Sequence, residues 1–234
     1  MGIIKHIEHF LKLIYPDICH ACQTLLVEGE DTICTQCLVS LPKTNDSFNG
    51  ESHLFTRFNA LYPCSIVSSF LYLSKKGKVE SMLYELKYKG KYKVGFTLGL
   101  LFGKSLMNSP LFCPEEYEWI IPVPIHKKRI KTRGYNQSTA IAEGLSKATG
   151  IALNENICKR VYATKSQTSK SKFARFFTME SAFEVVKPEL LTPDCGILIV
   201  DDVITTGATI DSLCKKIHLF NKVKHFGILS LARK

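Results

Sequence analysis

Two adjacent carboxylates, Asp201 and Asp202, follow an apolar run at residues 197–200 and precede a loop of small and hydroxyl-bearing residues. The run is continuous and aliphatic, as expected for a parallel strand buried on both faces. Ligands of open α/β sheets bind where such strands end, and a helix predicted after the loop favours an anion at its N-terminus. The stretch therefore predicts a phosphate beside a ribose diol, with loop residues Thr205, Thr206, Gly207, Ala208 and Thr209 around the phosphate.

This loop differs from a Walker P-loop, because the chain contains no G-x-x-x-x-G-K-[ST] pattern. The paired acids would also repel a bare polyphosphate unless they met hydroxyls or a metal. A purely structural alternative is a buried strand that ends in a turn, with Asp201 or Asp202 capping the next helix.

Four of the nine cysteines form two C-x2-C pairs, Cys19 with Cys22 and Cys34 with Cys37. Each pair can turn two thiolates to one side of a tight turn, and two pairs complete a tetrahedral shell suited to structural zinc. Two disulfides are the alternative, but the odd cysteine total and the absence of a secretory signal favour a reducing compartment. We expect zinc here and core positions for the other cysteines.

The chain has 234 residues, of which 45% are hydrophobic, and a formal net charge of +10. That length allows one sizeable core and a small appended module. Basic residues concentrate at 126–133 and 159–175, and lysines alternate with tyrosines at 72–93. Such surfaces attract polyanions, so a small phosphorylated substrate and a nucleic acid both qualify. A solvated basic face is the alternative for each patch.

The elements that would position these residues alternate between strands and helices, which predicts an α/β fold with a parallel sheet. Pro122 and Pro124 must end one of the strands. Strands are expected near 66–73, 119–121, 197–200 and 223–231, and helices near 79–86, 94–106, 136–149 and 210–217.

The predicted organisation is an amphipathic helix and zinc ribbon over residues 1–45, a linker over 46–60 and a second domain over 61–234. The linker is expected because Ser, Asn and Gly cluster there without periodicity. Charged and polar residues fall on the other face of the N-terminal helix, so it lacks the uninterrupted apolar core of a signal, and no apolar run is long enough for a membrane span. We expect a cytoplasmic protein.

The thirteen residues at 197–209, ILIVDDVITTGAT, resemble the phosphoribosyl pyrophosphate (PRPP) signature of type I phosphoribosyltransferases. Three further segments are similar, in order, to those of the ComF family of competence-associated phosphoribosyltransferase-like proteins. They are the cysteine pairs at 19–37, LKYKG at 86–90 and IPVPIHKKRIKTRGYNQS at 121–138. The resemblance implies a type I phosphoribosyltransferase fold with a central parallel sheet and a flexible hood or lid, preceded by a small zinc ribbon.

The resemblance also implies roles for individual residues. Asp201 and Asp202 would be catalytic and hold the ribose hydroxyls, and the following loop would wrap the 5′-phosphate. The pyrophosphate loop would be formed by Pro122, Val123 and Pro124, with Arg133 beside it.

Residues 161–178 resemble the lid of glutamine-dependent amidophosphoribosyltransferases, and Gln167 and Arg175 match its spaced glutamine and arginine. Arg175 would act in catalysis by ion-pairing with pyrophosphate when the lid closes. Thr178 departs from that pattern, because an asparagine is usual there. No glutaminase half is present, so ammonia channelling from glutamine is not expected.

The function implied is transfer of a ribosyl group from Mg-bound PRPP to an acceptor that the sequence does not identify, in association with DNA uptake. The alternative is a non-catalytic accessory protein of transformation that binds single-stranded DNA or competence proteins, using the same pocket and the zinc ribbon. Lysines and tyrosines at 72–93 suit base stacking, although aromatic residues at helical spacing also fit a core. A third reading is a PRPP sensor without turnover.

Overall fold

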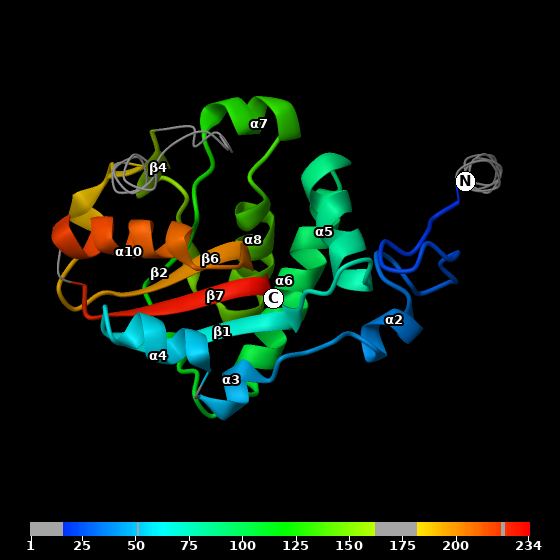
Figure 1. Cartoon of the computed structure of the whole chain (residues 1–234), viewed down its shortest axis with the longest axis horizontal. Coiled ribbons are helices and arrows are strands. Elements are labelled where there is room, and N and C mark those ends of the chain that lie inside the picture. The colour runs from blue at the N-terminus through cyan, green and yellow to red at the C-terminus, as the bar shows by residue number, and fades with distance from the viewer. Residues whose placement is uncertain (1–15, 51, 162–181, 221–222) are drawn as a thin grey trace, which may run out of the picture.

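The computed structural model describes residues 16–50, 52–161, 182–220 and 223–234. A five-stranded sheet forms its centre, with the strand order β1-β7-β6-β2-β3 and parallel pairing throughout (Figure 1). The strands are β1 (Cys64–Tyr72), β2 (Trp119–Pro122), β3 (Ala152–Leu153), β6 (Gly196–Ile204) and β7 (His225–Arg233). The predicted α/β class with a central parallel sheet is confirmed.

Helices cover both faces of the sheet, as its uninterrupted apolar strands require. Along β6, Leu198 and Val200 belong to one buried cluster, whereas Ile197 and Ile199 belong to another on the opposite face. The first cluster is covered by α5 (Lys78–Tyr88), α6 (Tyr92–Met107) and α8 (Gln137–Thr149), and the second by α4 (His53–Asn59) and α10 (Ala208–Phe220).

Helices α6 and α8 pack closely because glycines line their contact. A Cβ atom at Gly99 would collide with the backbone of Ile141, and one at Gly144 would collide with the backbone of Phe96. This close contact fixes α8 against the sheet. The first turn of α8 therefore lies beside the end of β6.

Several short elements complete the described chain. The basic run forms α7 (Lys127–Arg133), and a small antiparallel pair is made by β4 (Cys158–Arg160) and β5 (Phe183–Val185). The remaining elements are α2 (Thr35–Val39), α3 (Asp46–Asn49) and two 3-10 turns at Pro114–Glu116 and Pro188–Leu190.

The stretch predicted as a linker, residues 46–60, contains the two short helices α3 and α4. Asp46 is buried and accepts hydrogen bonds from Nε and Nη2 of Arg233, both at 2.9 Å. Leu54 and Phe58 are buried against the sheet. Helices of 4 and 7 residues are too short to show a helical period in the sequence. The division into two domains stays a prediction.

The cysteine module shares its core with the rest of the protein. Cys19, Cys34 and Cys37 are buried in the same apolar cluster as Leu86 of α5 and Phe102 of α6. The amphipathic helix predicted near the N-terminus falls on residues 1–15, outside the described ranges. Within those ranges, no helix has the length and apolar character to cross a membrane.

Candidate functional site

The acid pair lies inside β6, which runs further than the sequence indicated. Asp201 pairs with Ser230 of β7, and β6 stays paired with β7 to Ile204. On its other side the pairing with β2 ends at Pro122, opposite Val200. Beyond that point β6 has a partner on one side only, so both acids lie at the carboxyl edge of the sheet, next to the predicted pyrophosphate loop.

Asp201 is partly buried, and two donors form hydrogen bonds with its carboxylate. The hydroxyl of Ser138, in the first turn of α8, donates to its Oδ1 over 3.1 Å, and the Asp202 backbone N–H donates over 2.8 Å. Burial, together with the adjacent charge of Asp202, raises the pKa of Asp201 to about 7. This carboxyl therefore exchanges its proton near neutral pH.

Stability should consequently respond to pH through Asp201. The pKa of Asp201 is higher in the folded state than in the unfolded chain. Its contribution to the free energy of unfolding is therefore intact below about pH 4 and is lost as the pH rises to about 7. We expect the melting temperature of Asp201→Asn, relative to the natural chain, to increase between pH 4 and pH 8. Thermal unfolding at four or five pH values measures this, and a difference that stays flat or falls would contradict the raised pKa.

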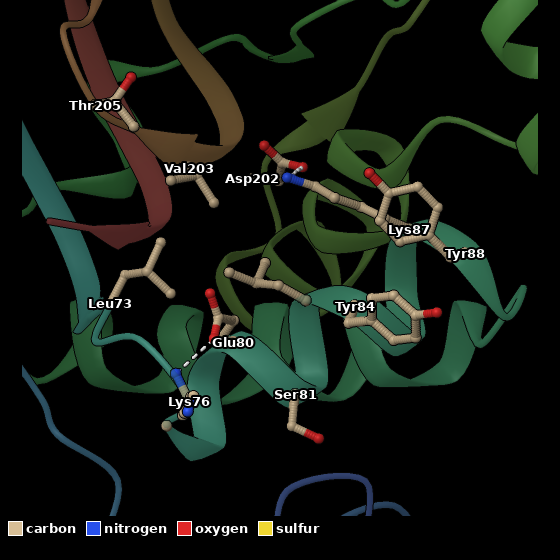
Figure 2. Close-up of a pocket in the computed structure, with 12 residues that line it drawn as sticks. Leu73, Lys76, Glu80, Ser81, Tyr84, Lys87, Tyr88, Asp202, Val203 and Thr205 are labelled. Atoms are coloured by element: carbon tan, nitrogen blue, oxygen red, sulfur yellow. Dashed lines mark hydrogen bonds and ion pairs between the residues drawn. The ribbon is translucent and has the colours of Figure 1, made fainter.

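Asp202 is paired with a lysine from a distant segment. Lys87 Nζ lies 2.6 Å from Asp202 Oδ2, and both side chains are largely buried (Figure 2). Lys87 belongs to the LKYKG segment at 86–90, so two of the motifs that the sequence singled out meet here. The lysine offsets the charge of one acid in the ligand-free site, and sugar hydroxyls would have to share or replace this contact.

The loop after β6 is the stretch predicted to surround a phosphate. Residues from Thr205 to Thr209 line a hollow of about 30 Å³ that leads into the N-terminus of α10. Gly207 has a φ of +70°, and a Cβ atom there would meet the ring of Phe58. Glycine is therefore needed both for the backbone conformation and for the close approach of α4.

Helix α4 supports this loop, although its residues fall in the stretch predicted as a linker. Arg57 Nη1 donates a hydrogen bond to the backbone carbonyl of Thr206. Just after the helix, Tyr62 donates to Asp211 Oδ1 in the first turn of α10 over 2.8 Å. Arg57 thus contacts the loop itself, and Tyr62 contacts the first turn of the helix that follows it. No pattern in the neighbouring sequence predicted either contact.

Replacing Arg57 with alanine should loosen the loop. Without the hydrogen bond from this charged donor, the loop must be ordered when the ligand binds. We therefore expect its affinity for a ligand phosphate to fall about 10-fold. Isothermal titration with Mg-PRPP measures this, and Thr56→Ala, at an exposed position of the same helix, serves as the control. An Arg57→Ala variant with unchanged affinity would remove the supporting role.

A basic cavity lies on the β2 side of the acids. It has a volume of about 470 Å³, and its walls include Pro122, Pro124, Lys127, Lys159 and Arg160. Buried Val123 accepts a hydrogen bond on its carbonyl from Asn136 Nδ2 over 3.1 Å, while the same side chain caps α8 at Ser138 N. The loop predicted for pyrophosphate is therefore fixed to α8 and faces cationic side chains.

Arg160 was not predicted for this site, yet it forms part of the cavity wall. Burial lowers the pKa of Arg160, and the nearby charge of Arg129 lowers it further, whereas the charge of Asp201 raises it. Arg133, which was predicted here, instead donates to Gln137 Oε1 over 2.8 Å and stacks on Tyr88, so its role at pyrophosphate stays a prediction. Gln167 and Arg175 of the predicted lid lie outside the described residues.

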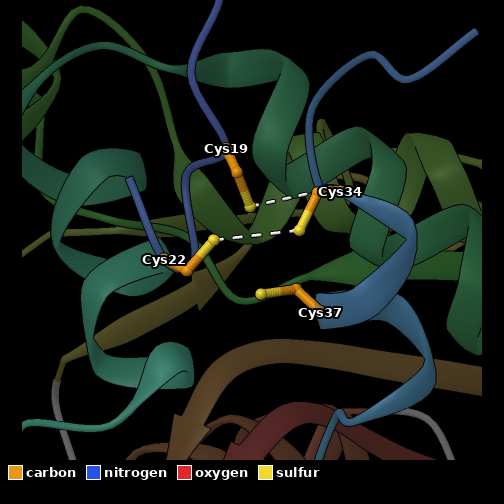
Figure 3. Close-up of side chains that lie close together, drawn as sticks. All are labelled: Cys19, Cys22, Cys34 and Cys37. Atoms are coloured by element: carbon orange, nitrogen blue, oxygen red, sulfur yellow. Dashed lines mark hydrogen bonds between the residues drawn. The ribbon is translucent and has the colours of Figure 1, made fainter. Parts of the chain in front are cut away.

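The four cysteines of the two pairs converge as predicted (Figure 3). Their Sγ atoms all lie within 4.8 Å of one another, and each thiol is free. The 3.8 Å between Cys22 Sγ and Cys34 Sγ matches the edge of a tetrahedron with Zn–S bonds of about 2.3 Å, and exceeds a disulfide bond of about 2 Å. This donor set fits a structural metal such as zinc.

Comparisons with known proteins agree with this arrangement. The chain is 30% identical over 156 residues to competence protein F of Haemophilus influenzae, covering 65% of the chain and 66% of that protein. It is 25% identical over 209 residues to DNA utilization protein YhgH of Escherichia coli K12, covering 88% and 86%. Competence protein ComFC of Streptococcus pneumoniae is 31% identical over 125 residues, covering 53% and 52%. No protein-family model matches the chain.

The matched region spans just under two thirds of the competence protein F of Haemophilus influenzae and 58% of YhgH from Salmonella typhimurium. Among solved structures, the allosteric regulatory enzyme of purine biosynthesis has a TM-score of 0.43 at 16% identity, over 63% of this chain and 30% of that one. An adenine phosphoribosyltransferase has a TM-score of 0.37 at 15% identity, over 65% and 75%. Both TM-scores are below 0.5. The strand order and the sequence relatives therefore determine the class of protein.

A central strand that carries two acids into a phosphate-type loop, within this sheet order, defines a phosphoribosyltransferase-like α/β protein. The sequence relatives then point to one family within this class. The chain is similar to the competence and DNA utilization proteins of the ComF family.

Proposed function

We propose that the chain binds Mg-PRPP and transfers its ribosyl group to an acceptor. The observation that carries this proposal is the junction of three features at one sheet edge: the acid pair, the small loop before α10 and the basic cavity beside Pro122 and Pro124. A diol, a monophosphate and a diphosphate are the chemical groups that these features suit in turn, and PRPP carries all three.

In this proposal each feature has one task. Asp201 and Asp202 accept hydrogen bonds from the ribose hydroxyls, and the backbone amides from Thr205 to Thr209 hold the 5′-phosphate. The diphosphate lies in the basic cavity, where Arg160 neutralises part of its charge. Magnesium would be held by the diphosphate oxygens and would screen the charge that develops on the leaving group.

Charge develops in two places when the bond between the anomeric carbon and the diphosphate breaks. The sugar becomes cationic, and the carboxylate of Asp202, together with that of Asp201 in its ionised form, stabilises it because Ser138 and Lys87 already orient the two side chains. The diphosphate leaves as an anion toward the cations of its cavity. Attack from the face opposite the diphosphate inverts the anomeric carbon.

Isothermal titration of Mg-PRPP into the zinc-loaded chain tests the proposal. We expect saturable binding, and weaker binding of ribose 5-phosphate, which lacks the diphosphate. Pyrophosphate release in the presence of candidate acceptors then reports turnover. A folded, zinc-loaded sample that shows no heat with Mg-PRPP would reject the proposal, whereas binding without release under any acceptor would favour a sensor.

A second candidate is a non-catalytic accessory protein that binds single-stranded DNA. It is favoured by the names of the relatives, which refer to competence and DNA utilization, and by Tyr84 and Tyr88, which are exposed on α5. Affinity for a DNA strand should fall steeply with salt, whereas binding of Mg-PRPP should respond less. Under either candidate, we propose a role in DNA uptake for a cytoplasmic protein.

A further inference from the structure

Helix α5 contacts the cysteine module on one side and the acid pair on the other. Lys78, Ser81 and Glu85 recur at spacings of three and four residues, so they share one side of the helix. Lys87 follows two residues after Glu85, about 200° further around the helix, and leaves it on the opposite side. Figure 2 shows Lys87 reaching Asp202, whereas Ser81 points away from the acids. A displacement of α5 would therefore change both contacts.

Three polar contacts attach the cysteine module to its side of α5. Lys78 Nζ donates a hydrogen bond to Ser40 Oγ over 2.7 Å, and Ser81 Oγ donates to the backbone carbonyl of His20 over 3.1 Å. His20 Nδ1 lies 3.5 Å from Glu85 Oε2. His20 belongs to the turn that carries the first cysteine pair, so the position of this turn and the position of α5 depend on each other.

Glu85 is the buried member of this contact, with only 5% of the residue exposed. Its second carboxylate oxygen, Oε1, lies 2.8 Å from Nζ of Lys89, the residue directly after α5. One carboxylate thus connects the cysteine module with the C-terminal end of the helix. A buried charge that loses a partner is strongly unfavourable. Glu85 therefore opposes any movement that separates α5 from the module.

Lys87 links the position of α5 to the charge of the acid pair. Its Nζ lies 2.6 Å from Asp202 Oδ2. Burial and the charge of Asp202 raise the pKa of Asp201, and the charge of Lys87 acts against both effects. Lys87 therefore favours the ionised carboxylates that would accept hydrogen bonds from ribose hydroxyls. If α5 moved away from β6, the acids would lose this cation.

A second ion pair between the cysteine module and the helices has no such connection to the site. Lys93 Nζ, in the first turn of α6, lies 2.6 Å from Asp31 Oδ1, and both side chains are 66% exposed. Exposed ion pairs contribute little to stability, because water and salt screen them. This pair provides a matched comparison for the buried contact of Glu85.

We propose that Glu85 is a positioning residue that holds α5 between the zinc-loaded cysteine module and the acid pair, so that zinc and Mg-PRPP each strengthen the binding of the other. The inference rests on the proposed function and on the predicted zinc. Bound zinc fixes the turn that carries His20, Glu85 holds α5 against this turn, and Lys87 then stays on Asp202. Because coupling between two sites is reciprocal, each ligand should raise the affinity for the other by the same factor.

The test measures the zinc affinity of the full chain by competition with a fluorescent zinc chelator, with and without saturating Mg-PRPP. In the natural chain, Mg-PRPP should raise the zinc affinity about 5-fold or more. Asp31→Asn should keep this factor, whereas Glu85→Gln, which keeps the size of the side chain, should lose it. The Asp201→Asn/Asp202→Asn variant, which should bind Mg-PRPP only weakly, corrects for zinc that the ligand itself takes up.

The outcomes separate the two proposals. A Glu85→Gln variant that melts at a lower temperature but keeps the factor has lost only structural support, and this result would overturn the positioning role. Equal zinc affinity of the natural chain with and without bound Mg-PRPP would also overturn it and leave the proposed function standing. Absence of Mg-PRPP binding would overturn both. Should Glu85→Gln not fold, Lys87→Gln decides, because its change lies at the acid pair and should also remove the factor; if the factor stays, the positioning role is wrong.

Discussion

Replacing both Asp201 and Asp202 with asparagine should weaken Mg-PRPP binding at least about 100-fold. Each carboxylate can accept charge-assisted hydrogen bonds from ribose hydroxyls, and losing two such interactions costs about 3–6 kcal/mol. Asparagine keeps the size of the side chain and an oxygen that can accept from Ser138. The fold should therefore survive the change, and isothermal titration of the two proteins gives the ratio of affinities.

The matched control removes the same net charge elsewhere. Glu189 and Asp194 are exposed before β6, so Glu189→Gln/Asp194→Asn alters the charge of the protein without touching the site. It should bind Mg-PRPP as the natural chain does. If the control loses affinity as well, long-range charge and not the acid pair determines binding; if the site variant binds normally, the proposed ribose contacts are wrong.

Loss of metal from the cysteine cluster should lower the melting temperature by about 10 °C or more. Cys37 is only 1% exposed and shares an apolar cluster with residues of α5 and α6, so its environment cannot relax without disturbing that core. Structural zinc contributes directly to folding free energy. A loss of about 4 kcal/mol corresponds to a shift of this size in a chain of this length.

The measurement compares Cys37→Ser with Cys113→Ser by thermal unfolding and by zinc content. Cys113 is exposed and outside the cluster, so its replacement should leave both quantities unchanged. Chelation of the natural chain should reproduce the effect of Cys37→Ser. A natural chain that melts at the same temperature with and without stoichiometric zinc would show that the cluster has no structural metal.

The sequence predicted the parts of the fold that depend on local pattern. Runs rich in apolar residues identified β1 and β6, and helical spacing identified α5, α6 and α8, because each of these helices buries its periodic apolar residues in one core. The two C-x2-C pairs predicted the sulfur cluster because short turns bring each pair together on their own. The acid pair and its loop were found for the same reason, since strand, acids and loop are consecutive.

Contacts between distant segments could not be predicted in this way. Arg57 and Thr206 are 149 residues apart, and nothing near either residue indicates the other. Lys87 lay in a motif, but its partner Asp202 follows only from the packing of α5 beside β6. The end of β6 was placed too early because carboxylates are unfavourable in a strand. Pairing with β7 keeps Asp201 and Asp202 extended nonetheless.

The position of β1 at one edge of the sheet affects how the chain can fold during synthesis. Apart from an isolated bridge between Lys43 and Leu71, β1 pairs in the described sheet with β7, and the contacting hydroxyls of Ser69 and Ser230 are 161 residues apart. A ribosome-bound chain therefore exposes an unpaired apolar strand until the residues of β7 have emerged. Such long-range pairing slows folding and favours aggregation of partly made chains. We expect the nascent protein to depend on chaperones more than an α/β protein whose neighbouring strands are consecutive.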